Sequence, residues 1–142
     1  MIIRELNSID LPKLADLYEQ FWGDKSYVSK MELQLEFIKR EKMHSILVCE
    51  EQGQVVGSVM GIVCRELYGD CRPFMVVENM IVDKTYRRSG IGQALLQELE
   101  RMAKERNCTQ MILVTEKDRE DACGFYEAYG FSQNTTGYKK KL

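Results

Sequence analysis

The sequence lacks the features of a secreted or membrane-spanning protein. Its 142 residues contain no apolar run that approaches the roughly 20 residues of a membrane-spanning helix. The N-terminal residues begin in a strand-like pattern and lack a signal-peptide core. The five cysteines are an odd number without a C-x-x-C pair, a pattern that favours neither a disulfide framework nor a metal site. We therefore expect a cytoplasmic location, no membrane partner and no metal.

The sequence also lacks an excess of positive charge and contains a single histidine. The formal net charge is −2, and the only basic run, Lys139 to Lys141, lies at the end of the sequence. This balance argues against a nucleic-acid surface. The single histidine, His44, is accompanied by no G-x-S-x-G element, so a serine-type hydrolase is disfavoured. What is present is an ordinary globular composition, 44% hydrophobic and 30% charged, at a length that predicts one domain over residues 1–142.

Hydrophobic periodicity predicts alternating strands and helices. Expected strands span 2–5, 45–50, 55–63, 74–82 and 110–115, with a final strand or strands within 131–139. Expected helices begin near Ser8 or Asp10 and end before Gly23, and then span about 29–42, 90–106 and 118–129. In the second helix we expect Leu33, Phe37 and Ile38 to face inward. A run of strands followed by a strand–helix–strand unit indicates an α/β (α+β) fold, in which a mixed, mostly antiparallel sheet has helices on both faces.

Two glycines stand between the expected strand at 74–82 and the expected helix at 90–106. Glycine lets the backbone approach a phosphate closely, and the amides and dipole of a helix start attract an anion. The spacing of Gly90 and Gly92 fits neither the P-loop nor the Rossmann fingerprint. The predicted diphosphate site consists of Arg87, Arg88, Ser89, Gly90, Ile91, Gly92, Gln93 and Ala94.

This segment resembles the signature [QR]-x-x-G-x-[GA] of the GNAT family of acyl-CoA-dependent N-acetyltransferases. The matching residues are Arg87, Gly90 and Gly92. A second segment, 122–131, is similar to the family's A-x-x-F-Y-x-x-x-G-F element at the usual separation, so the resemblance covers essentially the whole chain. It implies the GNAT fold and acetyl-CoA as the acyl donor. One departure is Arg119, which stands where many members carry an asparagine near the pantetheine arm.

Glu78 is the candidate general base. Regular alternation would place its carboxylate in an otherwise apolar row formed by Phe74, Val76, Met80 and Val82. Burial in such a row would make a carboxylate a better proton acceptor. Glu78 also precedes Arg87 by nine residues, the place where polyamine and aminoalkylphosphonate acetyltransferases of the family carry a glutamate that accepts the ammonium proton through water. The alternative is a Glu78 that faces solvent or caps a neighbouring strand.

The resemblance assigns two further roles. Tyr126, the tyrosine of the F-Y pair, would be the general acid that protonates the departing thiolate, while Tyr129 fits a core tyrosine better. The backbone of Met80, Ile81 and Val82 would pair with the amides of pantetheine and hold the oxyanion.

The sequence thus predicts an enzyme that moves an acetyl group from acetyl-CoA to the primary amine of a small molecule by direct attack in a ternary complex. The acceptor could be a polyamine, an aminoalkylphosphonate, an aminoglycoside or an amino-acid-like compound. Protein N-terminal or lysine acetylation, transfer of a larger acyl group and a non-catalytic acyl-CoA sensor stay open as alternatives, as does a homodimer. Acidic and aromatic residues of the first two expected helices suit an ammonium-bearing acceptor, or else form a solvated face: Glu19, Trp22, Asp24, Tyr27, Glu32 and Glu36.

Overall fold

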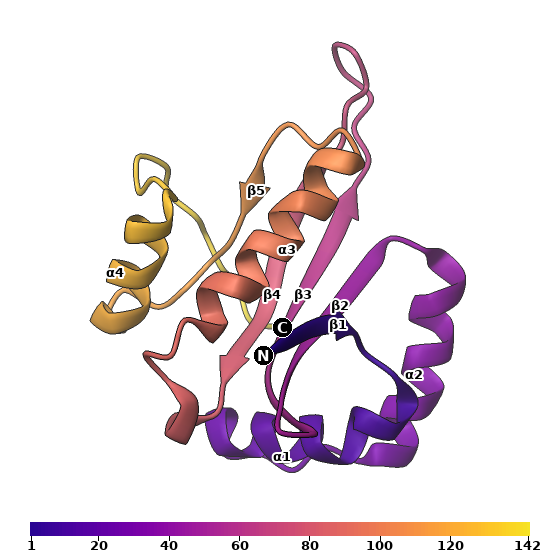
Figure 1. The fold of residues 1–142 in the computed structure, drawn as a ribbon. Helices are drawn as coiled ribbons and strands as arrows, with labels where there is room; N and C mark the ends of the chain where they lie inside the picture. The colour runs from indigo at the N-terminus through magenta and orange to yellow at the C-terminus, as the bar shows by residue number, and fades with distance from the viewer. The chain divides into compact units, whose positions relative to one another are not determined.

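The computed structural model describes residues 1–142, which form two compact units, 1–112 and 113–142. The first unit contains β1 (Ile2–Glu5), η1 (Ser8–Asp10), α1 (Leu11–Trp22), α2 (Val28–Glu41), β2 (His44–Glu51), β3 (Gln54–Cys64), β4 (Phe74–Val82), η2 (Lys84–Tyr86), α3 (Ile91–Glu105) and β5 (Met111–Ile112) (Figure 1). The second unit contains α4 (Glu120–Tyr129). No helix combines the length and apolar character that a membrane crossing requires.

A five-stranded sheet in the order β1-β2-β3-β4-β5 forms the centre of the first unit. The first three pairings are antiparallel and β4 pairs with β5 in parallel. The predicted hairpin between β2 and β3 is confirmed, and its two turn residues, Gln52 and Gly53, both have positive φ, 52° and 78°. That geometry is the two-residue turn whose twist matches the flanking strands. The expected α/β (α+β) fold with a mostly antiparallel sheet is confirmed.

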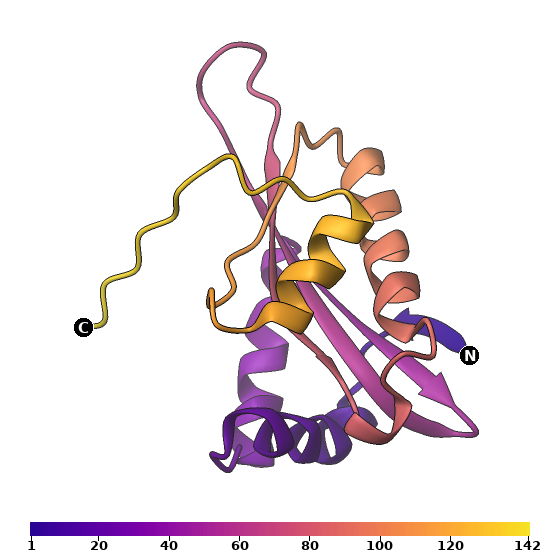
Figure 2. The ribbon, with the colours of Figure 1, turned by 90° about the vertical axis from the view of Figure 1, so that its left-hand side faces the viewer.

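Helix α3 covers one face of the sheet at close range (Figure 2). Its buried residues include Leu95 and Leu99, which meet two glycines of β3. A Cβ atom placed on Gly57 would lie 3.0 Å from Cγ2 of Ile91, and one on Gly61 would lie 2.6 Å from Cδ1 of Leu99. These two positions therefore accept α3 only because they carry no side chain.

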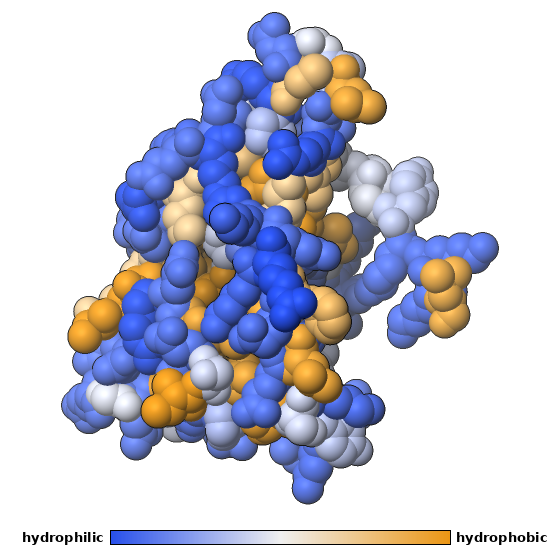
Figure 3. Space-filling model, turned by 90° about the vertical axis from the view of Figure 1, so that its right-hand side faces the viewer, coloured by the Kyte–Doolittle hydropathy of each residue, from blue (hydrophilic) through white to orange (hydrophobic).

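Helices α1 and α2 cover the opposite face. Their core cluster comprises Leu6, Leu11, Leu14, Leu17, Leu35, Val48, Val55 and Ile81. In α2, Val28, Met31 and Leu35 are the residues that pack inward, at the i, i+3, i+7 spacing of one helix stripe. Leu33 and Phe37 lie off this stripe and are 68% and 58% exposed, so the expectation that they face inward is wrong. Figure 3 shows hydrophobic side chains exposed among hydrophilic ones on the side of α2.

The later strands are shorter than the sequence predicts. Only Met111 and Ile112 pair with β4, where a strand over 110–115 was expected. In the second unit, α4 ends as predicted before Gly130, whose φ is 116°, but residues 131–139 form no strand. Asn134 and Gly137, two residue types that are depleted in strands, interrupt this segment.

Candidate functional site

The loop that joins β4 to α3 is held by hydrogen bonds at its start. Asp83 caps η2 by accepting from the amide of Thr85 at 2.9 Å and from its hydroxyl at 2.7 Å. These bonds stabilise the carboxylate and lower the pKa of Asp83. The amide of Lys84 donates to Oε1 of Gln20 in α1 at 3.0 Å, so the loop is also tied to that helix.

Two residues of this loop have left-handed backbone conformations. Arg88 has φ 62° and Gly90 has φ 85°. Gly90 is the N-cap of α3, no side chain caps the helix, and a Cβ atom on Gly90 would meet nothing within 4 Å. The first N–H groups of a helix have no partner within the helix, and left-handed residues turn successive amides toward one concave surface. The open, uncapped helix start therefore offers amides to an anion.

The predicted diphosphate site has the exposure and charge that an anion site requires. Arg87, Arg88, Ser89 and Gly90 are all exposed, so an approaching phosphate meets the loop without a covering side chain. Nε of Arg87 donates to the carbonyl of Val82 at 3.3 Å, which places this guanidinium at the end of β4. Close backbone approach, a helix dipole and two cationic side chains are the ingredients of an anion site.

Strand β4 lies against the same loop. Beneath the first turn of α3, a Cβ on Gly57 would lie 3.1 Å from the carbonyl oxygen of Ile81 and 3.0 Å from Ile91. The structure thus brings the predicted pantetheine strand, 80–82, next to the predicted diphosphate loop, 87–94.

A β-bulge interrupts β4 immediately after Glu78. Ser58 pairs with Ile81 and Met60 pairs with Glu78, so one residue of β3 faces two of β4, Asn79 and Met80. Asn79 has φ 51°, a left-handed value that Asn adopts more readily than most residues. The bulge shifts the alternation of side chains along the strand.

The predicted apolar row is therefore wrong beyond Glu78: Phe74 and Val76 keep the expected alternation with Glu78, but Met80 and Val82 do not. Directly paired residues of antiparallel strands share a face of the sheet. Val82 pairs with Gly57, and Gly57 faces α3, so Val82 also faces α3. Ile81 lies on the opposite face, in the core cluster under α1 and α2. Glu78 itself is exposed, so the burial expected to tune it as a base is absent.

The bulge also has a neighbour that sequence reasoning missed. The bulged residue Asn79 lies near the phenol of Tyr18 in α1. Burial of the phenol raises the pKa of Tyr18 to about 12, although the nearby Asn79 side chain acts in the opposite direction. The available sequence signal was the asparagine itself, because Asn is depleted in strand interiors.

Tyr126 lies on α4, in the second unit. Its ring makes edge contacts with Phe125 at 5.3 Å and with Phe131 at 5.8 Å between centroids. Tyr129 lies 6.0 Å from Phe131 at a tilted angle. Within its own unit, α4 therefore carries the F-Y pair and Tyr129 in one aromatic group. Glu78, the strand 80–82 and the loop 87–94 belong to the first unit.

Comparison with known proteins agrees with this geometry. The family model described as "Acetyltransferase (GNAT) family" matches residues 11–131. The chain belongs to this family. As a GNAT protein it is an acyltransferase of the N-acetyltransferase class, and enzymes of the family use acetyl-CoA as cosubstrate.

Two curated relatives illustrate the range of the family. The Bacillus subtilis protein YdhI is 27% identical over 131 residues, which cover 92% of this chain and 74% of YdhI. The glucosamine 6-phosphate N-acetyltransferase of Trypanosoma brucei brucei is 30% identical over 79 residues, 56% of this chain and 52% of that enzyme. The second match therefore spans about half of each protein.

Solved structures share the GNAT fold. A putative acetyltransferase from Agrobacterium tumefaciens superposes with a TM-score of 0.93 at 24% identity, with all of both chains covered. The glucosamine-6-phosphate N-acetyltransferase of Arabidopsis thaliana gives a TM-score of 0.89 at 23% identity, covering 99% of this chain and 97% of that one.

Proposed function

We propose that this GNAT enzyme transfers an acetyl group from acetyl-CoA to the primary amine of a small molecule, by direct attack in a ternary complex. The observation that carries the proposal is the uncapped start of α3, with its left-handed Arg88 and Gly90, beside the bulged strand β4. The uncapped start of α3 suits the diphosphate of acetyl-CoA. The bulged strand β4 suits the pantetheine arm that leads to the thioester.

The edge of β4 that faces β5 is the proposed seat of the pantetheine arm. β5 pairs with β4 only at Met75 and Val76, so β4 continues for six residues beyond its last β5 partner. Peptide groups on such an edge can pair with the amides of an extended ligand, as an added strand would. An amide of the segment 80–82 would then hold the oxyanion that forms when the amine attacks the acetyl carbonyl.

Two side chains would move the protons of the reaction. Glu78, acting through water, takes the proton that the ammonium must lose before its nitrogen attacks. The new C–N bond forms, the C–S bond breaks, and Tyr126 donates its phenol proton to the departing thiolate. The nitrogen releases its second proton to give the neutral amide, and that proton restores the phenol. Because Glu78 is exposed, its role rests on its place beside the bulge and not on burial.

The acceptor region is proposed to lie along α1 and α2. Glu32 and Glu36 line a hollow of about 480 Å³ beside η1. Trp22 is 48% exposed, and Lys30 Nζ already lies 5.3 Å from the ring centroid of Tyr27. Carboxylates and an open aromatic face favour an ammonium-bearing molecule. The name of the trypanosomal relative, which acts on glucosamine 6-phosphate, supports a small amine.

A panel of amines tests the proposal. Thiol release from acetyl-CoA would be followed with polyamines, aminoalkylphosphonates, aminoglycosides, amino acids, glucosamine 6-phosphate and unblocked peptides. We expect at least one small amine to stimulate release. Stimulation by peptides alone would overturn the small-molecule assignment in favour of protein acetylation. Tight acetyl-CoA binding without release by any amine would overturn catalysis in favour of an acyl-CoA sensor.

A further inference from the structure

The sheet face under α1 and α2 is buried at one end and open at the other. Val48, Ser58 and Ile81 pair in one row across this face, and their exposed fractions are 0%, 1% and 2%. The next rows of the same face are Ile46–Met60–Glu78, His44–Ile62–Val76–Ile112 and Cys64–Phe74. No residue of these later rows is buried. Burial therefore falls from complete to partial along one continuous face.

The open end of this face is apolar. Five side chains on β3, β4 and β5 form a surface that we call the apolar floor: Met60, Ile62, Phe74, Val76 and Ile112. Four of them are half-buried, and Ile112 is 39% exposed. Contiguous apolar side chains on the surface of a soluble protein mark a place where a ligand or a partner binds.

Glu78 supplies the carboxylate at the edge of the apolar floor. It pairs with Met60 and follows Val76 by two residues, about 7 Å along the strand. No lysine or arginine occurs in β2, β3, β4 or β5, so these strands offer no cation to a phosphate or phosphonate. The imidazole of His44 lies at the far margin, with Nδ1 3.8 Å from Oε2 of Glu41. One carboxylate beside an apolar surface complements a molecule with one ammonium and an apolar body.

We propose that the acceptor is an amphipathic primary amine, whose ammonium lies at Glu78 and whose alkyl or aromatic body lies on the apolar floor. The inference rests on the proposed function and narrows its acceptor class. The floor continues the face that α1 and α2 cover, because Ile46 of the adjoining row packs against the core cluster there. A polyamine would place a second ammonium on apolar side chains, and an aminosugar would place several hydroxyls there, at a cost in lost hydration.

Two amines of equal length give a sharp test, since 1,6-diaminohexane differs from hexylamine only by a second ammonium. In the thiol-release assay we expect kcat/KM to rise about tenfold from propylamine to hexylamine, mainly through KM, because the added methylenes leave water. The diamine should fall back to about the propylamine value. Equal values for propylamine and hexylamine would overturn the proposal. A higher value for the diamine, 2-aminoethylphosphonate or glucosamine 6-phosphate than for hexylamine would also overturn it.

Ile62→Thr tests whether the gain with chain length arises at the apolar floor. Threonine keeps the β-branched shape that suits a strand. The ratio of kcat/KM for hexylamine to that for propylamine should fall from about tenfold to about threefold, while the propylamine value stays within about twofold of the parent. Ile2→Thr is the matched control, since Ile2 is 57% exposed on β1, which β2 and β3 separate from β4. It should keep the parent ratio.

Val76→Thr, which is closer in shape to the parent residue, repeats the test if Ile62→Thr folds poorly. We expect the same fall in the ratio of kcat/KM. A parent-like ratio in a folded variant at either position would overturn the assignment of the apolar floor.

Methyl NMR distinguishes a wrong floor from a wrong reaction. Hexylamine would be titrated into the enzyme in the presence of coenzyme A, which carries no acetyl group to transfer. We expect the methyl signals of Ile62 and Val76 to shift, while that of Ile2 stays unchanged. If no amine stimulated thiol release, the proposed function would fail, and shifts at Ile62 and Val76 would still support the floor as a site for amphipathic amines. Unshifted signals at both positions would overturn it.

Discussion

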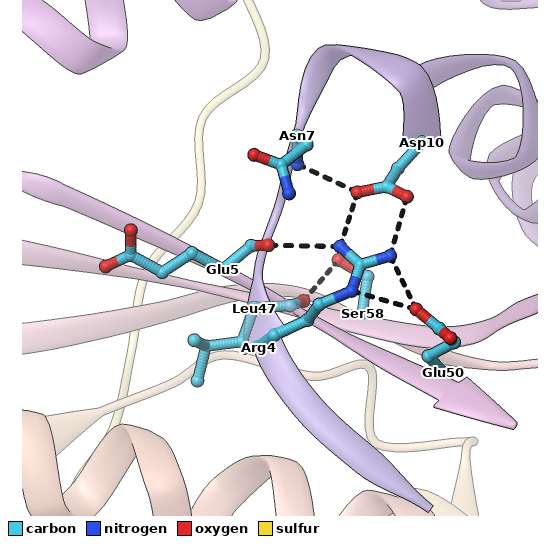
Figure 4. Close-up of polar contacts among 7 residues, drawn as sticks. All are labelled: Arg4, Glu5, Asn7, Asp10, Leu47, Glu50 and Ser58. Atoms are coloured by element: carbon cyan, nitrogen blue, oxygen red, sulfur yellow. Dashed lines mark hydrogen bonds and ion pairs between the residues drawn. The ribbon is translucent and has the colours of Figure 1, made fainter. Parts of the chain in front are cut away.

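Arg4 forms a bidentate ion pair with Asp10: Nη1 donates to Oδ2 at 2.7 Å and Nη2 donates to Oδ1 at 2.9 Å (Figure 4). The same guanidinium donates from Nε to Oε2 of Glu50 at 2.9 Å, and the amide of Asn7 donates to Oδ2 of Asp10 at 2.8 Å. This network joins β1, η1 and β2. Because Asp10 is buried, its charged hydrogen bonds with Arg4 should stabilise the fold more than those of an exposed ion pair would.

The network should make stability depend on pH. The hydrogen bond from Arg4 lowers the pKa of Asp10 in the folded protein. A carboxyl whose folded pKa is depressed contributes stability that is present above its unfolded value of about 3.9 and is lost as pH falls below it. We expect Asp10→Asn to cost about 2 kcal/mol at pH 7, in line with a charged hydrogen bond. Thermal unfolding of both proteins should show this difference shrinking toward pH 2.5. A constant difference at all pH values would contradict the charge-based account.

Gly92→Val should weaken acetyl-CoA binding, because a branched side chain in the first turn of α3 stands between a phosphate and the backbone amides. We expect a folded protein with at least a tenfold loss of affinity, about 1.4 kcal/mol. Calorimetric titration measures it. Gln97→Val, which places the same side chain at an exposed position further along α3, should bind acetyl-CoA as the parent does. Unchanged affinity in Gly92→Val would contradict the proposed diphosphate site at the start of α3.

Tyr126→Phe should lower turnover by roughly 10²-fold or more with little change in acetyl-CoA affinity, as expected when a general acid loses only its hydroxyl. Steady-state kinetics at saturating acceptor, with Tyr129→Phe as the partner variant, give the comparison. Tyr129→Phe should be milder. The reverse ranking would transfer the acid role to Tyr129.

Glu78→Gln should reduce turnover most near neutral pH. An amine of pKa about 10 is mostly protonated there and needs a base, whereas at alkaline pH the free amine is abundant. The pH–rate profile should therefore show partial rescue as pH rises. An increase in the acceptor KM alone would indicate that Glu78 binds the ammonium and moves no proton. A profile that overlays the parent's would redirect attention to Glu32 or Glu36.

Local signals in the sequence predicted the elements from β1 to α3 well, whereas β5 is much shorter than expected. β1 and β4 have the expected bounds, and α1 ends at Gly23, whose φ of 81° explains why glycine stands there. Such features depend on a few neighbouring residues. Gly90, the N-cap of α3, is informative for the same reason, because its φ of 85° favours glycine.

Features that depend on packing could not be predicted in this way. Strict alternation cannot foresee that one extra residue, Asn79, enters β4 and moves Val82 to the face of the sheet opposite Glu78. Nor could the periodicity of α2 show which of two apolar stripes would meet the sheet, so Leu33 and Phe37 were assigned to the wrong side. The identity of the acceptor belongs to this second kind of property, because the acceptor is proposed to bind along α1 and α2, whose surface depends on how the two helices pack.

Gly57 lies beneath the first turn of α3, between the proposed diphosphate loop and the proposed pantetheine strand. A methyl group at Gly57 would press on Ile91, at the base of the diphosphate loop, and on the carbonyl of Ile81, in the strand proposed to hold the pantetheine arm. A substitution at Gly57 would therefore push the proposed diphosphate loop away from the proposed pantetheine strand. The two protein segments that contact opposite ends of the donor would then lie farther apart. Donor preference could thus drift, or be engineered, through a buried position that an inspection of ligand contacts would pass over.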